Sequence, residues 1–232
     1  MRAVTAWIAV LVRTLFVCCI AYPVVLLWLG IHVRHRERLP LKGPAIIAAN
    51  HNSHLDVLVL LFLFPLRCVA AVQPAAAADY FFRNAWLKWF ALNVVAIVPV
   101  LRGGIAEGAD PLAACCTALD AGKILLIFPE GTRGDPEQVG QFKSGIWYLA
   151  SRFPQAPVVP LYMHGLGKAM PKGALIPVPH LVRVAIGRPL YGTLSKPDFM
   201  AALKERLAQL RRKALPVPDP DPDPDPDPDI DC

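Results

Sequence analysis

The sequence predicts a single α/β domain that follows an apolar, helical N-terminal segment. Short buried-strand patterns alternate with helical patterns, and an uncharged run near the N-terminus has the length of one bilayer crossing. About 180 residues lie between this run and a repetitive tail, enough for one sizeable core. We therefore expect a membrane-binding segment over 1–38, one domain over 39–215 and a disordered tail over 216–232.

The composition favours membrane attachment over many membrane crossings. Hydrophobic residues make up 55% of the chain and the mean hydropathy is +0.42, high for a soluble protein but low for a chain with many crossings. The body, 1–215, holds all 24 Lys and Arg but 11 of the 18 acidic residues, a balance of about +13. We expect it to bind a phospholipid surface or phosphorylated substrates, and not nucleic acid, because zinc-finger spacing and Lys/Arg runs are absent.

The N-terminal segment contains the uncharged run 14–33, which Arg13 bounds on one side. A basic cluster bounds the other side, made of Arg34, His35, Arg36 and Arg38. The positive-inside tendency then predicts that the domain lies on the cytoplasmic face. Two arrangements stay open: one helix crosses the bilayer, or Arg13 and Pro23 divide the segment into two helices that enter one leaflet. A cleaved signal peptide fits less well, because no A-x-A site ends this long run.

The first half of the domain begins with an apolar run, 45–50, that is typical of a buried strand. A turn and an apolar helix over 57–64 follow, and Pro65 ends that helix. A second strand is expected over 67–72. An aromatic-rich helix over 79–92 would suit a membrane interface, an acyl chain or a packed core.

The second half starts with a strand over 94–101, a helix of small residues over 111–121 and the clearest buried strand of the chain, 123–128. The remaining expected elements are a helix over 141–153, strands over 157–163 and 181–187, and an amphipathic basic helix over 197–213. From residue 216 the chain alternates Asp and Pro, which excludes helix and sheet ladders, so we expect an extended tail.

His51 and Asp56 are the first candidate catalytic pair. Five positions apart on an ideal helix, they would differ by about 140° in azimuth, so both cannot lie on one regular helix and still meet. His51 must precede the helix, and Asp56 must fold back from its first turn. Asp56 could then hold one imidazole N–H while the other ring nitrogen takes a proton from a substrate hydroxyl.

Two alternatives exist for the same segment. Ser53 and Asp56 match a capping-box-like S-x-x-D before an apolar run, so Asp56 could simply cap the helix. A metal site of His51, His54 and Asp56 is also conceivable, although no further ligand cluster follows it in the chain. We expect no metal.

A second candidate site is the loop that follows the strand 123–128. Its backbone N–H groups, a hydroxyl and a planar guanidinium suit a phosphate, and a plain surface turn is the alternative. The residues concerned are Glu130, Gly131, Thr132 and Arg133, with Glu130 placed to steer the guanidinium. Arg102, at the end of another strand, could be a further phosphate ligand or an interfacial arginine that reaches the membrane surface.

Together these blocks resemble the glycerolipid acyltransferase family, which includes the 1-acylglycerol-3-phosphate acyltransferases. The matching blocks are Asn50-His51-x-x-x-x-Asp56, the strand ending in Arg102, Phe128-Pro129-Glu130-Gly131-Thr132-Arg133 and Val159-Pro160, in the family's order. The resemblance implies a mixed sheet flanked by helices and an N-terminal membrane-binding helical segment.

The resemblance also implies an activity. An acyl group would pass from acyl-CoA or an acyl-carrier protein, as co-substrate, to the hydroxyl of lysophosphatidic acid and form phosphatidic acid. His51 would be the general base and Asp56 its orienter, the phosphate would lie against Arg102 and 130–133, and no metal or cofactor would be needed. Another lysophospholipid or an aminolipid could be the acceptor, and a non-catalytic membrane lipid-binding module is the alternative from another class.

Three departures from the family pattern bear on the acceptor. Many members have an Ala-Lys pair between the first two blocks, where this chain has Ala77-Ala78. Val100-Leu101 stand before Arg102 in place of an aromatic or acidic residue, and Gly134 follows Arg133 in place of serine. The resemblance therefore leaves the head-group preference open.

Overall fold

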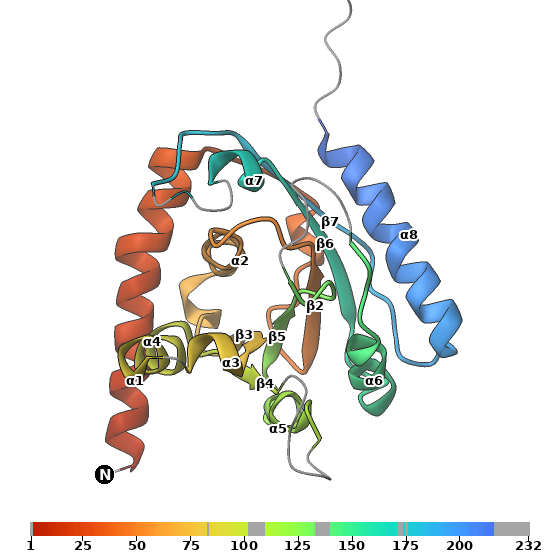
Figure 1. Cartoon of the computed structure of the whole chain (residues 1–232), viewed down its shortest axis with the longest axis horizontal. Helices are drawn as coiled ribbons and strands as arrows, with labels where there is room; N and C mark the ends of the chain where they lie inside the picture. Colours follow the sequence, from red (N-terminus) through yellow and green to blue (C-terminus); the bar gives the residue numbers. More distant parts are fainter. Residues whose placement is uncertain are drawn as a thin grey trace, which may run out of the picture.

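A mixed sheet of seven strands forms the centre of the described part of the chain (Figure 1). The computed structural model describes residues 2–82, 84–101, 110–132, 140–170, 174 and 176–215, the side chains of 2–6 and 80 excepted. The strands are β1 Ile31–Arg34, β2 Ala45–Ala49, β3 Val72–Ala77, β4 Val98–Val100, β5 Ile124–Ile127, β6 Val158–His164 and β7 Val182–Ile186. Their order is β1-β7-β6-β2-β5-β3-β4, and all neighbours are parallel except β6 and β7.

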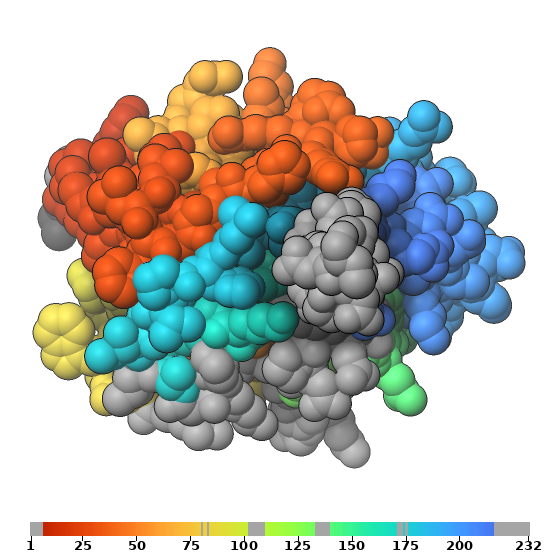
Figure 2. Space-filling model, turned by 90° about the horizontal axis from the view of Figure 1, so that it is seen from above, coloured from red at the N-terminus to blue at the C-terminus, as the bar shows by residue number. Residues whose placement is uncertain are grey.

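Helices cover both faces of this sheet. They are α1 Arg2–Phe16, α2 Asp56–Leu63, α3 Ala78–Phe81, α4 Ala85–Phe90, α5 Ala113–Asp120, α6 Gly145–Arg152, α7 Leu166–Ala169 and α8 Lys196–Ala214. Shorter 3₁₀ or π segments are η1 Val17–Ala21, η2 Val24–Leu29, η3 Arg36–Arg38, η4 Leu66–Cys68 and η5 Ala91–Val95. The N-terminal helix and α8 lie on opposite sides of the molecule (Figures 1 and 2).

Strand β2 lies in the middle of the sheet, and every one of its residues is buried. Ile47 belongs to the apolar core beneath the N-terminal helix and α2, whereas Ile46 and Ala48 belong to the core beneath α5, α6 and α8. Successive side chains of a strand point to opposite faces, so a strand covered on both faces needs a continuous apolar run. The residue after β2 is therefore held at the carboxyl edge of a rigid layer.

The N-terminal helix is continuous from 2 to 29, through both Arg13 and Pro23. Pro23 has no amide hydrogen to donate, and the ladder on both sides of it adopts the wider π winding, with Tyr22 N–H donating to Val17 O. The helix ends at Gly30, whose φ of 56° favours glycine. Of the two arrangements that the sequence left open, the division of this segment into two helices at Arg13 and Pro23 is therefore not the one in the structure.

The strand β1 lies within the segment 1–38 that was predicted as a membrane-binding unit. It pairs with β7 in register Ile31↔Val182, so the sheet begins directly after Gly30. In β1 the exposed residues His32 and Arg34 alternate with the partly buried Ile31 and Val33. The strand was not predicted because its exposed residues were interpreted as part of a basic flank. Within the described residues, Trp7–Leu29 is one helix long and apolar enough to cross a bilayer, by length and composition.

Three other predicted elements differ from the structure. The strand predicted over 67–72 begins only at Val72, because η4 and a turn follow Pro65. The helix predicted over 79–92 is interrupted between α3 and α4, where Asn84 Oδ1 caps α4 by accepting the N–H of Trp86 at 2.8 Å. The strand predicted over 94–101 is shortened to β4, because η5 occupies its start. The predicted tail, 216–232, lies outside the described residues.

Candidate active site

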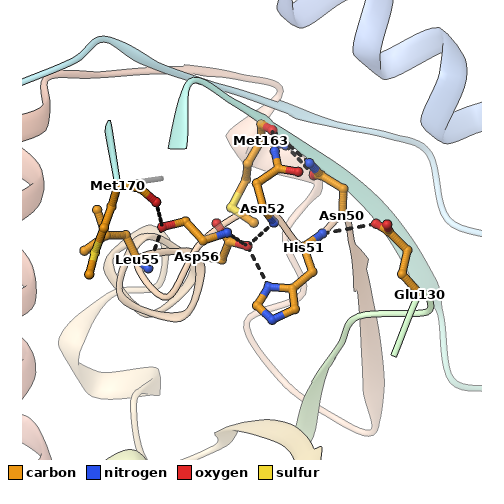
Figure 3. A network of polar contacts seen from close by, with 9 residues as sticks. Asn50, His51, Asn52, Leu55, Asp56, Glu130, Met163 and Met170 are labelled. Atoms are coloured by element: carbon orange, nitrogen blue, oxygen red, sulfur yellow. Dashed lines mark hydrogen bonds and ion pairs between the residues drawn. The ribbon is translucent and has the colours of Figure 1, made fainter. Parts of the chain in front are cut away.

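The side chains of His51 and Asp56 meet at the carboxyl end of β2 (Figure 3). His51 follows the strand in a turn, Asp56 is the first residue of α2, and His51 Nδ1 lies 2.8 Å from Asp56 Oδ2. An ionised carboxylate only accepts hydrogen bonds, so Nδ1 carries the ring proton and Nε2 keeps its lone pair. Asp56 is fully buried, whereas the His51 side chain is 21% exposed. This is the geometry of an oriented base.

Asp56 also satisfies the backbone of the turn that precedes its helix. Its Oδ2 accepts the N–H groups of Asn52 at 2.7 Å and Ser53 at 3.0 Å, in addition to the imidazole. Ser53 Oγ accepts the N–H of Leu55 at 3.3 Å, so the hydroxyl does not reach the third residue as a capping box requires. One carboxylate thus serves both the capping and the orienting interpretation, because three donors converge on one oxygen.

The His51 turn is anchored to β6 through Asn50. Asn50 Oδ1 accepts the N–H of Met163 at 2.7 Å, and its Nδ2 donates to Met163 O at 2.9 Å. The β2–β6 pairing ends at Ala49↔Leu161, so the amide side chain continues the ladder where the backbone turns away. A buried asparagine directly after a buried strand was the sequence signal for this contact, which sequence reasoning missed.

The loop after β5 supports His51 from the other side. The Phe128 ring stacks on the imidazole, with ring centroids 4.2 Å apart and 21° between the planes. Glu130 Oε1 accepts the backbone N–H of His51 at 3.2 Å (Figure 3). Its Oε2 accepts the N–H of Gly140 at 3.0 Å. Glu130 is only 6% exposed, and burial raises the pKa of its carboxyl group above 4.5. Its described hydrogen bonds are thus with the backbone N–H groups of His51 and Gly140.

A groove of about 910 Å³ opens beside His51. Its apolar walls come from distant parts of the chain and include Phe16 of the N-terminal helix, Phe90 of α4, Cys115 of α5 and Leu149 of α6. Phe16 and Phe90 contact each other edge to face with centroids 5.5 Å apart. Burial raises the pKa of the Cys115 thiol to about 12, so this side chain is a small neutral part of the wall.

The predicted phosphate-binding residues are only partly described. Gly131 and Thr132 line the groove together with His51. Glu130 is not among the lining residues, and its carboxylate accepts the backbone N–H of His51. Arg102 and Arg133 lie outside the described residues. Within the described residues, no group of three or more His, Cys, Asp or Glu side chains is placed to hold a metal ion.

A family model described as Acyltransferase matches residues 30–164, a range that contains β1 to β6. The chain is 32% identical over 166 residues to "1-acyl-sn-glycerol-3-phosphate acyltransferase BAT2, chloroplastic" of Brassica napus, a match that covers 71% of this chain and 45% of that protein.

Two further relatives are also named as 1-acyl-sn-glycerol-3-phosphate acyltransferases. The chain is 33% identical over 177 residues to "1-acyl-sn-glycerol-3-phosphate acyltransferase LPAT1, chloroplastic" of Arabidopsis thaliana, covering 73% of this chain and 46% of that one. It is 30% identical over 134 residues to the human "1-acyl-sn-glycerol-3-phosphate acyltransferase alpha", covering 57% and 45%. The chain thus spans less than half the length of these curated relatives.

A solved structure has the same architecture. The crystal structure of the 1-acyl-sn-glycerophosphate (LPA) acyltransferase PlsC from Thermotoga maritima aligns with a TM-score of 0.66 at 22% identity, covering 82% of this chain and 74% of that one. The predicted fold, a mixed sheet flanked by helices with an N-terminal apolar helix, is confirmed.

Proposed function

The chain belongs to the acyltransferase family, and from this premise we propose that it transfers an acyl group from an acyl thioester to the free hydroxyl of 1-acylglycerol 3-phosphate. The product would be phosphatidic acid, a precursor of membrane phospholipids. The observation that carries the proposal is the His51–Asp56 pair: Nδ1 is engaged at 2.8 Å by a buried carboxylate, and the ring lines an apolar groove.

The reaction follows from this arrangement. Nε2 of His51 takes the proton from the acceptor hydroxyl as its oxygen attacks the carbonyl carbon of the thioester. The new C–O ester bond forms, the C–S bond breaks, and the imidazolium returns its proton to the departing thiolate. Asp56 stabilises the imidazolium that exists between these two transfers. Base catalysis of this type contributes about 10²–10⁴ in rate.

The two ends of the acceptor require different surroundings. We assign its phosphate to the strand-end loop with Gly131, Thr132 and Arg133, and to Arg102. Glu130 supports this loop from behind, because its carboxylate joins the loop to the backbone of His51. The groove between Phe16, Phe90 and Leu149 suits an acyl chain, and acyl-CoA or an acyl-carrier protein would supply the donor.

We further propose that the N-terminal helix lies in one membrane leaflet and does not cross the bilayer. Its inner face packs on the domain along its length: the Arg13 guanidinium donates to Val72 O, and Tyr22 contacts Phe62 edge to face at 4.8 Å. A crossing helix would carry these domain residues into the hydrocarbon. The outer face is apolar, and Leu27 is 84% exposed.

An aromatic pair beside this helix suits the same surface. Trp86 and Trp89 of α4 are exposed and lie edge to face with centroids 6.0 Å apart. Indole rings are enriched at membrane interfaces, because they combine an apolar body with a polar N–H. The basic body then fits the anionic cytoplasmic surface.

The test is an acyl-transfer assay with labelled acyl thioester and a panel of acceptors, with and without phosphate. Wild type should acylate 1-acylglycerol 3-phosphate, His51→Ala should lose at least about 10² in kcat, and His32→Ala, an exposed histidine of β1, should match wild type. If only another lysophospholipid or an aminolipid is acylated, that lipid is the acceptor in place of 1-acylglycerol 3-phosphate. Binding of lipid without turnover would make the chain a lipid-binding module and reject the proposal.

A further inference from the structure

Lys143 lines the groove beside His51, and it belongs to neither of the predicted phosphate-binding blocks. It precedes α6, and its backbone N–H donates to Pro129 O at 2.8 Å, which ties it to the loop after β5. Among the described residues that line the groove, Lys143 alone is a lysine or arginine. Lys143 is therefore the one lysine or arginine in the described wall of the groove that could pair with an anionic group.

The lysine side chain runs across Gly131. A Cβ atom placed on Gly131 would lie 2.8 Å from Lys143 Cε and 3.0 Å from Cδ, closer than carbon atoms approach. Gly131 also has a φ of +72°, which an L side chain rarely adopts. The glycine thus allows both the turn of the loop and the passage of the lysine stem over it.

Lys143 and the reacting imidazole of His51 share one groove. Gly131 directly follows Glu130, whose carboxylate bonds to the His51 backbone, and both His51 and Lys143 line the same groove. No hydrogen bond or ion pair joins the Lys143 ammonium to another described residue, and the side chain is exposed. A freely solvated surface lysine is the plain alternative, because the φ of Gly131 by itself favours glycine; the position of Lys143 in the wall of the groove that also contains His51 favours a role in binding.

We propose that Lys143 binds the phosphate of the acceptor and sets the preference for a phosphorylated lipid. In the acceptor, one carbon and one ester oxygen separate the hydroxyl-bearing carbon from phosphorus. A cation that holds the phosphate must therefore lie close to His51. An ammonium group offers three donors and a compact charge, and Thr132, which carries a hydroxyl, lines the same groove. This inference rests on the proposed function and adds a residue that determines its substrate class.

The experiment compares Lys143→Met and Lys143→Arg with Lys204→Met, an exposed lysine of α8 that does not line the groove. Acceptors are 1-acylglycerol 3-phosphate and the monoacylglycerol that lacks the phosphate. Lys143→Met should raise the KM for the phosphorylated acceptor about tenfold or more, with kcat within about twofold, because one charge-assisted contact is lost. Lys143→Arg should restore much of the affinity, and monoacylglycerol turnover and Lys204→Met should not change.

An unchanged KM for the phosphorylated acceptor in Lys143→Met would overturn the inference. An equal loss with both acceptors would also overturn it, because the lysine would then act on the fold or on the donor. Binding of 1-acylglycerol 3-phosphate without donor is measured in parallel. A wild type that binds this lipid but turns over no acceptor would reject the proposed function, and the binding constants would still decide the role of Lys143.

Discussion

The imidazole of His51 lies nearly flat on the ring of Phe128, with centroids 4.2 Å apart. Asp56 holds one edge of the imidazole, and Phe128 supports its face, so the ring has little freedom to turn away from the groove. The strand-end loop thus acts on the base directly, in addition to its proposed contact with phosphate. This connection between two blocks of the sequence gives the first prediction.

Phe128→Leu should lower kcat about tenfold with a small change in KM, because the apolar volume is kept but the flat support is lost. Phe128→Tyr keeps an aromatic face and should stay close to wild type. Steady-state kinetics with saturating donor measures both values. Equal kcat values for Phe128→Leu and wild type would show that Asp56 alone orients the ring.

The buried carboxyl group of Glu130 predicts a pH dependence of stability. Burial raises its pKa above 4.5, so the folded protein holds this proton more tightly than the unfolded chain. The group therefore stabilises the fold most below pH 4.5, and this contribution is lost as the pH rises through the raised value. Thermal unfolding midpoints should be measured from below pH 4.5 to above the raised pKa of Glu130. The stabilising contribution of this group should be lost with rising pH in wild type and not in Glu130→Gln.

Glu205→Gln provides the control for this comparison, because Glu205 is an exposed carboxylate on α8. It should keep the wild-type pH dependence. If Glu130→Gln retains the same slope as wild type, the carboxyl group of Glu130 does not carry the effect.

Alanine substitutions at Gly131 and Gly122 test whether the stem of Lys143 must pass over Gly131. Both have positive φ, +72° and +68°, but a Cβ on Gly122 would meet no atom closer than 3.9 Å. Each alanine variant should lose about 1–2 kcal/mol of stability from backbone strain. Only Gly131→Ala should also raise the KM for the phosphorylated acceptor, because it displaces Lys143. Chemical denaturation and kinetics separate the two effects, and equal KM values in the two variants would argue against the path.

The orientation of the N-terminal helix predicts where its outer face lies in a membrane. Leu11 and Leu27 are both exposed on that face and lie 16 positions apart in the helix. Fluorescent probes on Leu11→Cys and Leu27→Cys, in a Cys18→Ser, Cys19→Ser background, should be quenched at similar depth from the same leaflet. Probes at opposite surfaces would establish a helix that crosses the bilayer.

Several features of the site could be predicted from the sequence because they depend on local geometry. The azimuth of His51 relative to Asp56 requires a turn followed by a helix, and the structure has this arrangement. The apolar runs predicted β2, β5 and β6, because a strand buried on both faces must be apolar throughout. Strand β3 was misplaced because its Val-Gln-Pro-Ala sequence has weak strand preference, and pairing with β5 overrides it.

Other features depended on which elements became neighbours. Glu130 and His51 are 79 residues apart, and their contact exists because β5 pairs with β2 in the sheet. Arg13 bounds the uncharged run, but only the fold shows that its side chain is buried between α1 and Val72, where burial lowers its pKa to about 10. Local sequence determines the turns and periodicities that place His51 before Asp56. The partners of Glu130, Phe128 and Lys143 depend on strand order and long-range packing, and only the tertiary structure decided them.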